Sequence, residues 1–232
     1  MNMTSMDMAK AAAAVAKPLE LAVVLPTLNE RANVAPMVER LEQALGPSGW
    51  EAVFVDDNSR DGTADLIREI AKTDPRIRVI QRIGRRGLAS AAIEGMCATA
   101  APFVAVMDAD HQHDPQLLLD MLEAVKSGEY DLAYASRFAA GGSAEGLSSK
   151  GREKGSRIAN SLARKLTGTQ LSDAMSGFFL LRTDQLRSQA DRLSGIGFKI
   201  MLDILATAHP PLRVKELPLK FAERASGESK LD

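Results

Sequence analysis

Two aspartates separated by one residue, Asp108 and Asp110, are the pair in this sequence best suited to binding a metal ion. They follow an apolar run, residues 103–107, where a buried strand would end and the backbone would turn. Two carboxylates so placed can reach one hard cation such as Mg²⁺ or Mn²⁺, with Gln112 adding an amide oxygen. The alternative is a turn that leads into a helix, with Asp114 as its cap and Pro115 at its first position.

A second acidic pair, Asp56 and Asp57, follows another apolar run, residues 51–55. A carboxylate at such a strand end can accept hydrogen bonds from a nucleobase or a ribose. Turn chemistry is the alternative, and it accounts for residues 61–63, where an acid, a glycine and a threonine precede an expected helix. Two consecutive acids are more than a turn requires, so both interpretations stay open for this pair.

Basic side chains that could neutralise a bound anion lie in the second half of the chain. A diphosphate in a site lined by acids needs cationic partners, and arginine binds phosphate oxygens bidentately. The glycine-containing tail, residues 227–230, could fold over such a site as a lid. The candidates, each of which could instead be a solvated surface charge, are Arg137, Arg152, Arg157, Arg224 and Lys230.

The segments that must position these groups are short apolar runs alternating with amphipathic stretches. This pattern predicts strands buried on both faces, and hence an α/β domain with a mostly parallel sheet flanked by helices. Ligands bind beyond the carboxyl ends of such strands, which is where both acidic pairs fall. Strands are expected at residues 21–25, 51–55, 77–80, 103–107, 132–135 and 213–217, and helices at 34–45, 63–72, 88–100, 115–126, 152–166 and 198–208.

The two ends of the chain and its middle carry less regular patterns. Residues 1–18, rich in Met and Ala, predict a flexible leader rather than a signal peptide, and residues 19–232 one domain whose tail, 221–232, closes as a lid. Residues 138–155 predict a long loop. The basic amphipathic helix at 152–166 suits either an anionic membrane interface or ordinary packing at the surface.

Composition excludes several classes of protein. The chain has 232 residues with 29 Lys and Arg against 30 Asp and Glu, so it lacks the basic excess of a nucleic-acid binder. Its apolar runs are all shorter than the roughly 18–20 residues that span a bilayer. The single cysteine, Cys97, cannot form an internal disulfide and is expected to be a small buried residue in a reducing compartment.

Taken in order along the chain, the motifs resemble those of family 2 glycosyltransferases with the GT-A fold. The later ones resemble the polyprenyl-phosphate mannosyltransferases, the dolichol-phosphate mannose synthase branch. Each motif alone is common, whereas the ordered set, from about residue 21 to the last, is specific. The motifs are Pro26-Thr27-x-Asn29-Glu30, Asp56-Asp57-x-Ser59-x-Asp61-Gly62-Thr63, Asp108-Ala109-Asp110-x-Gln112-His113-x-Pro115, Ser136-Arg137, Arg152 with Ser156-Arg157 and Asn160, Asp173-x-Met175-Ser176-Gly177-Phe178-Phe179, Gly197-Phe198-Lys199 and Arg224-x-x-Gly227-Glu228-Ser229-Lys230-Leu231.

The resemblance implies a role for each matching position. Asp108, Asp110 and Gln112 would hold the divalent cation, and Asp108, Asp110 and Arg137 would be the catalytic set. The acceptor phosphate would meet Arg137, Arg152 and Arg157. The nucleotide donor would meet Pro26, Leu28, Glu30, Asp56, Asp57, Gly87, Arg224 and Lys230.

Two positions depart from the family pattern. Leu28 stands where relatives often carry Tyr, which removes a ring that could stack on the base. Ala89 replaces a glycine of the usual Gly-Leu-Gly run, so the sugar pocket is expected to differ slightly.

The implied activity is an inverting transfer of a hexose, mannose from GDP-mannose, to dolichyl or undecaprenyl phosphate with Mg²⁺ or Mn²⁺ as the cofactor. A lipid monophosphate is already largely ionised at neutral pH, so no side-chain nucleophile or obligatory base is expected. Nothing in the base-pocket motifs separates guanine from uracil, so UDP-glucose or another UDP-sugar remains an alternative donor.

The expected partners follow from that activity. They are the nucleotide-sugar, the polyprenyl phosphate and a membrane surface, against which the chain would lie peripherally on the cytoplasmic side. The chain is either naturally short, with a membrane-protein partner, or a catalytic domain trimmed of a C-terminal transmembrane region.

Two other classes of function are less compatible with the residues. A phosphatase of the haloacid-dehalogenase type also uses an Asp-x-Asp pair, but near its N-terminus and with Thr or Val two residues after the second Asp. Here the pair lies in mid-chain and position 112 is Gln. A non-catalytic scaffold would not need the intact set of acids and bases.

Overall fold

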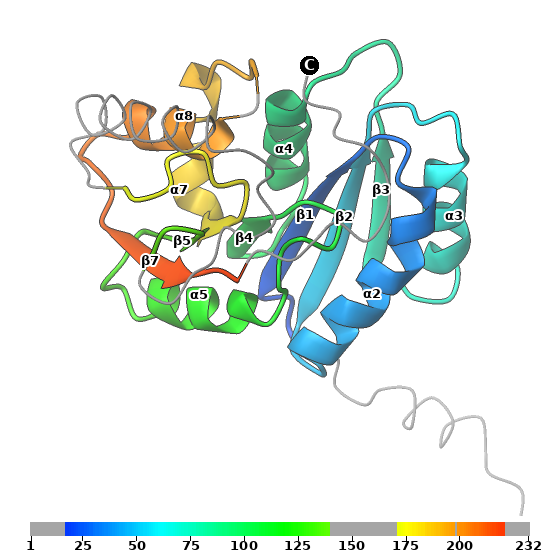
Figure 1. Ribbon diagram of the computed structural model, residues 1–232, viewed down its shortest axis with the longest axis horizontal. Helices are drawn as coiled ribbons and strands as arrows, with labels where there is room; N and C mark the ends of the chain where they lie inside the picture. The colour runs from blue at the N-terminus through cyan, green and yellow to red at the C-terminus, as the bar shows by residue number, and fades with distance from the viewer. Residues whose placement is uncertain (1–16, 140–170, 198, 221–232) are drawn as a thin grey trace, which may run out of the picture.

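Seven strands form one sheet, in the order β3-β2-β1-β4-β6-β5-β7, in the computed structural model, which describes residues 17–139, 171–197 and 199–220 (Figure 1). Strands β1, β2, β3 and β4 are parallel neighbours, and β5 is parallel to β7. Strand β6 lies antiparallel between β4 and β5. The strands are β1 (Leu21–Thr27), β2 (Trp50–Asp56), β3 (Ile77–Gln81), β4 (Phe103–Val106), β5 (Leu132–Ser136), β6 (Phe179–Arg182) and β7 (Val214–Pro218).

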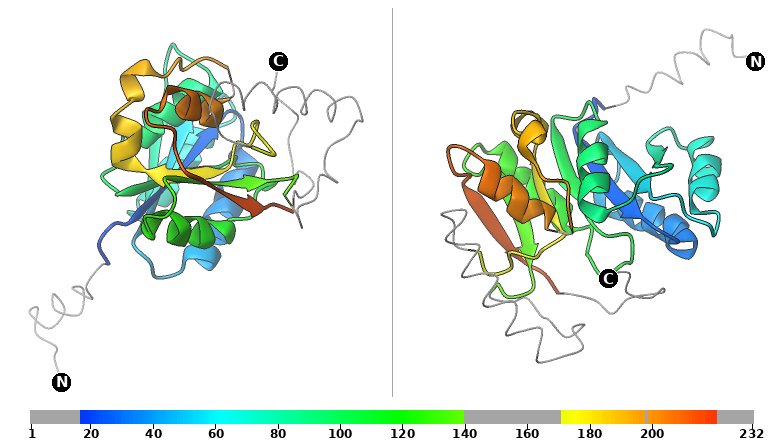
Figure 2. Two further views of the ribbon diagram at one scale, coloured as in Figure 1. Left: turned by 90° about the vertical axis from the view of Figure 1, so that its left-hand side faces the viewer. Right: turned by 90° about the horizontal axis from the view of Figure 1, so that it is seen from above.

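Helices cover both faces of the sheet (Figure 2). One apolar cluster holds buried side chains of α2, α3 and α5, and a second, on the other face, those of α4, α7 and α8. The helices are α2 (Arg31–Leu45), α3 (Thr63–Ala71), α4 (Leu88–Cys97), α5 (Leu117–Lys126), α7 (Thr183–Arg187) and α8 (Ile200–Thr207), with a 3-10 turn, η1, at Ala190–Arg192.

The strand sequences explain this two-sided burial. All seven residues of β2 are buried, and six of the seven in β1, because each strand has a helix layer above and below it. Helix α4 approaches the sheet closely at Gly95. A Cβ atom there would lie 2.7 Å from Val55 Cγ2 and closer still to Val24 Cγ1, so this position needs a residue without a side chain.

The predicted α/β class and mostly parallel sheet are confirmed, and all six predicted strands are present. The antiparallel strand β6, helix α7 and the 3-10 turn were not predicted. The prediction that Cys97 is buried is wrong, since Cys97 ends α4 with its side chain exposed. The leader, most of the expected loop, the helix expected at 152–166 and the tail lie outside the described residues. No helix among the described residues is long and apolar enough to cross a membrane.

Candidate active site

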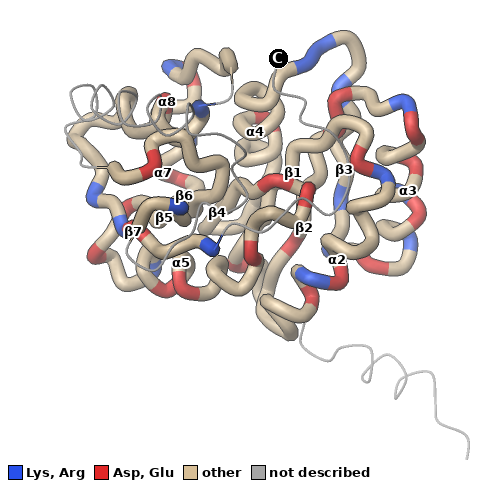
Figure 3. The backbone as a smooth tube through the Cα atoms, in the orientation of Figure 1, with Lys and Arg blue, Asp and Glu red and all other residues tan. Residues whose placement is uncertain are grey.

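The loops that follow β1, β2, β4 and β5 leave the sheet at one edge. Strand register aligns Thr27 with Asp56 and Val24 with Val106. Phe179, the first residue of β6, pairs with Val106 on one side and with Tyr134 of β5 on the other. Because β6 is antiparallel, the segment before it reaches this same edge, and acidic positions gather there near the labels of β1, β2 and β4 (Figure 3).

Asp108 lies just beyond β4, where a buried histidine supports it. The backbone N–H of Asp108 donates a hydrogen bond to Nδ1 of His113 (3.1 Å), and His113 Nε2 lies 3.8 Å from Asp108 Oδ2. Burial lowers the pKa of His113 to about 4, so its ring is neutral at pH 7 and carries its proton on Nε2. The ring also stacks on Phe178, with 5.1 Å between centroids. These contacts hold the backbone of Asp108 in one place.

Asp108, Asp110 and Gln112 have the chemistry of a site for a hard cation. The Asp108 side chain is 42% exposed and Gly177 lies beside it, since a Cβ at Gly177 would be in ordinary van der Waals contact with Asp108 Oδ2, at 3.5 Å. Asp110 is buried, and its Oδ1 accepts the backbone N–H of Gln112 (3.1 Å). The described residues contain no cluster of three or more His, Cys, Asp and Glu side chains that could hold a metal ion by themselves. Two carboxylates and an amide fit Mg²⁺ or Mn²⁺, which complete their shells with water and phosphate oxygens.

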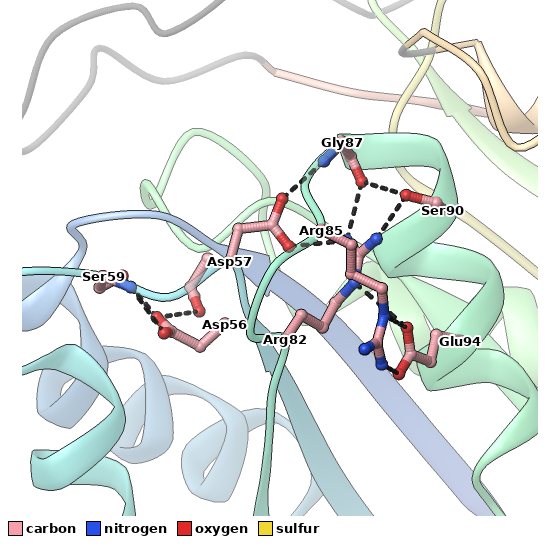
Figure 4. Close-up of polar contacts among 9 residues, drawn as sticks. Asp56, Asp57, Ser59, Arg82, Arg85, Gly87, Ser90 and Glu94 are labelled. Atoms are coloured by element: carbon pink, nitrogen blue, oxygen red, sulfur yellow. Dashed lines mark hydrogen bonds and ion pairs between the residues drawn. The ribbon is translucent and has the colours of Figure 1, made fainter.

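Asp57 belongs to a buried charge network that holds the loop between β3 and α4 (Figure 4). Its Oδ1 accepts from Arg82 Nη1 (2.6 Å), and its Oδ2 accepts from the backbone N–H of Gly87 (2.7 Å). The fully buried Arg82 also donates to the carbonyl of Gly87 (3.0 Å) and to Ser90 Oγ (2.6 Å), and its Nε lies 3.1 Å from Glu94. Each carboxylate oxygen has a further lone pair, so Asp57 can still accept a hydrogen bond from a ligand.

Asp56 has a local role, as the turn interpretation predicts. Its carboxylate accepts the N–H (2.9 Å) and hydroxyl (2.5 Å) of Ser59, and it is completely buried. These contacts, with a hydrogen bond from Thr27 Oγ1 to Asp56 Oδ1 (3.4 Å), shape the turn after β2 and join it to β1.

Arg137 follows β5 and forms a bidentate ion pair. Its Nε and Nη2 donate to Asp173 Oδ2 (2.7 Å) and Oδ1 (2.8 Å). Asp173 is fully buried and lies in the segment before β6, whereas the Arg137 side chain keeps 18% exposure. The pair fixes the plane of the guanidinium at the edge where Asp108 lies.

The loop after β1 carries Glu30 and is tied to the loop after β2. The backbone N–H of Asn29 donates to Ser59 Oγ (2.8 Å), and that of Glu30 donates to Thr63 Oγ1 (3.0 Å). Glu30 itself accepts from Asn33 Nδ2 (2.5 Å) and is partly buried. Pro26 and Leu28 are also partly buried on this segment.

Comparison with known proteins identifies the family. The model of the family described as Glycosyl transferase family 2 matches residues 22–188, which is more than half of the chain. The chain belongs to this family.

Three curated relatives of this family 2 glycosyltransferase share one name. The dolichol-phosphate mannosyltransferase of Pyrococcus furiosus is 37% identical over 219 residues, which cover 92% of this chain and 59% of that protein. The protein of the same name from Saccharomyces cerevisiae is 34% identical, over 92% of this chain and 81% of that one. The chain thus spans about three fifths of the archaeal relative and four fifths of the yeast one.

Solved structures agree on the fold. Glucosyl-3-phosphoglycerate synthase from Mycobacterium tuberculosis, in complex with Mn²⁺, UDP and glucosyl-3-phosphoglycerate, superposes with a TM-score of 0.60 at 20% identity, covering 98% of this chain and 78% of that one. A mannosyltransferase from Pyrobaculum calidifontis in complex with GDP-Man and Mn²⁺ gives 0.57 at 18% identity, over 87% and 55%. The predicted GT-A fold is confirmed.

The predicted site residues divide into three groups in this glycosyltransferase. Those at or just beyond the carboxyl ends of β1, β2, β4 and β5 lie at the common edge of the sheet. Gly87 lies at the start of α4 and is tied to that edge through Asp57. Arg152, Arg157, Arg224 and Lys230 lie outside the described residues.

Three residues with clear supporting roles were given none from the sequence. His113 and Asp173 are part of the motifs, but only the structure shows which site residue each one contacts. Arg82 was not among the basic candidates, because its complete burial is visible only in the structure. An arginine directly after an apolar strand and opposite an acidic strand end is the signal that could have found it.

Proposed function

We propose that this glycosyltransferase transfers mannose from GDP-mannose to a polyprenyl phosphate, with inversion at the anomeric carbon. The name shared by curated relatives at 33–37% identity supports both the sugar and the lipid phosphate. The observation that carries the proposal is the placement of Asp108, Asp110 and the Arg137–Asp173 pair at one edge of the sheet. An acidic metal site beside an oriented guanidinium suits a reaction between two phosphate-bearing substrates.

The roles of the described residues follow from their positions. Glu30 and Asp57, with Pro26, Leu28 and Gly87, would form the nucleoside side of the site. Asp108, Asp110 and Gln112 would hold Mg²⁺ or Mn²⁺, which when bound neutralises the charge of the departing nucleoside diphosphate. Arg137 would bind the acceptor phosphate and hold its oxygen in line with the anomeric carbon. No side chain is needed as a nucleophile, because the lipid phosphate is already ionised.

The remaining roles rest on residues outside the described part. Arg152 and Arg157 would add to the acceptor phosphate site, and Arg224 and Lys230 would close on the donor from a lid at 221–232. The lipid acceptor places the reaction at a membrane surface, against which we propose that the chain lies peripherally.

Nucleotide binding gives the most direct test. Thermal-shift titration of the protein with GDP and with UDP, each with Mn²⁺, should show stabilisation by GDP at lower concentration. Transfer of labelled mannose from GDP-mannose into an organic-extractable lipid phosphate should then be observed. Preference for UDP would move the assignment to a UDP-sugar donor, and stabilisation by neither nucleotide would overturn the proposal.

A further inference from the structure

Arg40, in the middle of α2, reaches across to the turn that follows Asp110. Its Nη1 donates to the carbonyl of His111 (3.1 Å) and lies 3.2 Å from His111 Nδ1. Its Nη2 donates to the carbonyl of His113 (3.1 Å). One guanidinium thus binds two carbonyls on either side of Gln112, within the segment that carries the proposed metal ligands.

The turn adopts a conformation that needs such support. His111 has φ +68°, in the left-handed region that residues other than glycine rarely adopt. Its side chain is buried. Since Nδ1 faces the donor Nη1 of Arg40, the ring accepts a hydrogen bond there. Both the backbone and the ring of His111 therefore contact Arg40 of α2.

Two hydrogen bonds lie within the segment itself. His113 Nδ1 accepts from the backbone N–H of Asp108, and Asp110 Oδ1 accepts from that of Gln112. The His113 ring also stacks on Phe178, outside the segment. Arg40 adds a direct link from the segment to α2, the helix that Glu30, on the proposed nucleoside side of the site, directly precedes.

We propose that Arg40 is a positioning residue that fixes the 108–113 segment against α2 and thereby sets the affinity of the site for its divalent cation. The inference rests on the proposed function, because it takes Asp108 and Asp110 as the metal ligands. Arginine suits the task, since its planar fork presents two donors in a fixed geometry, whereas lysine offers a point charge on a flexible stem. Residues that support metal ligands from outside the coordination shell commonly change metal affinity by about 10–100-fold when they are replaced.

The test compares Arg40→Met and Arg40→Lys with Arg68→Met, which removes an exposed arginine on α3 whose side chain contacts Asp65 and Gln81. Mn²⁺ binding is followed by electron paramagnetic resonance of free Mn²⁺, in the presence of GDP. Hydrogen exchange of the metal-free protein is measured over a peptide that spans residues 108–113. His111→Asn, which tolerates a positive φ but loses the imidazole, serves as a second variant if Arg40→Met does not fold.

Arg40→Met should weaken Mn²⁺ binding by about tenfold or more and speed hydrogen exchange in the 108–113 peptide. Arg40→Lys should fall between it and the wild type, and Arg68→Met should match the wild type. His111→Asn should weaken binding in the same direction by a smaller factor. Transfer by Arg40→Met should recover when Mn²⁺ is raised, since the ligands themselves are intact.

Wild-type Mn²⁺ affinity in both Arg40 variants, with unchanged exchange at 108–113, would overturn the proposal and leave the transferase assignment standing. Absence of Mn²⁺ and GDP binding in the wild type would instead overturn the proposed function. Faster exchange throughout the protein, rather than in this peptide, would show a general loss of stability and also contradict a positioning role.

Discussion

Replacing Asp57 with Asn tests the buried network around the proposed nucleoside side of the site. The two carboxylate oxygens of Asp57 accept from fixed donors, Arg82 Nη1 and the backbone N–H of Gly87. Asparagine has one oxygen and one NH₂ group, so either orientation of its amide places a donor against a donor. The variant also removes the closest counter-charge of Arg82, whose side chain is only 1% exposed.

The expected cost follows from this burial. Removal of one partner from a buried ion pair costs about 3–5 kcal/mol, because the other charge stays in the interior. Arg82 retains Glu94 at 3.1 Å, and Glu94 stays ionised because its hydrogen bond with Arg85 lowers its pKa. We therefore expect the lower end of the range, about 3 kcal/mol.

Urea unfolding measures this cost, and the chain offers a matched control. The Asp65–Arg68 pair has nearly the same separation, 2.7 Å against 2.6 Å, but its side chains are 83% and 44% exposed. Asp65→Asn should cost no more than about 0.5 kcal/mol. A loss below about 1 kcal/mol for Asp57→Asn, or equal losses in the two variants, would refute the claim that burial makes this network important.

Three further changes have defined outcomes. Asp110→Ala should abolish Mn²⁺-dependent stabilisation by GDP and lower sugar transfer by about 100-fold or more, and unchanged transfer would disprove the metal assignment. Gly95→Ala should lower the free energy of unfolding by about 1–3 kcal/mol, because its methyl group would overlap Val24 and Val55; chemical denaturation checks this. His113 has its pKa lowered to about 4 by burial, so the folded state binds fewer protons than the unfolded state. Stability that is fully present above about pH 6.5 should be lost progressively as the pH falls toward 4, and His113→Asn should flatten this slope in denaturation measured across that range.

Hydrophobic patterning predicted the parallel part of the sheet because strands buried on both faces appear as continuous apolar runs. The same rule failed at β6. Its apolar run, residues 178–181, has only four residues, and periodicity alone does not separate so short a run from other buried segments. An antiparallel strand needs no crossover helix, and pairing with two distant strands is a tertiary property that local sequence does not encode.

The acidic strand ends could be predicted for a similar reason, since parallel strands bring their carboxyl ends to one edge. Which of these acids faces a ligand could not be predicted from the sequence. Asp56 and Asp57 are adjacent in sequence, yet their partners differ. Asp56 accepts a hydrogen bond from Ser59 in a local turn, whereas Asp57 accepts one from Arg82, 25 residues away in the sequence. The first contact is short-range and fits turn chemistry, whereas the second depends on the alignment of β2 with β3.

The direction of β6 explains how Asp173 comes to lie beside Arg137 and Gly177 beside Asp108. Because β6 runs against β4 and β5, Asp173 and Gly177 arrive before it at the edge where Asp108 and Arg137 leave. A parallel strand in the same position would have brought its N-terminal flank to the opposite edge and left Arg137 without Asp173. The arginine would then be a flexible surface charge, whereas the observed pair presents it in one orientation. The antiparallel strand β6 therefore brings the partner that orients Arg137 in the candidate site, whereas the parallel strands β1, β2 and β4 bring its acids.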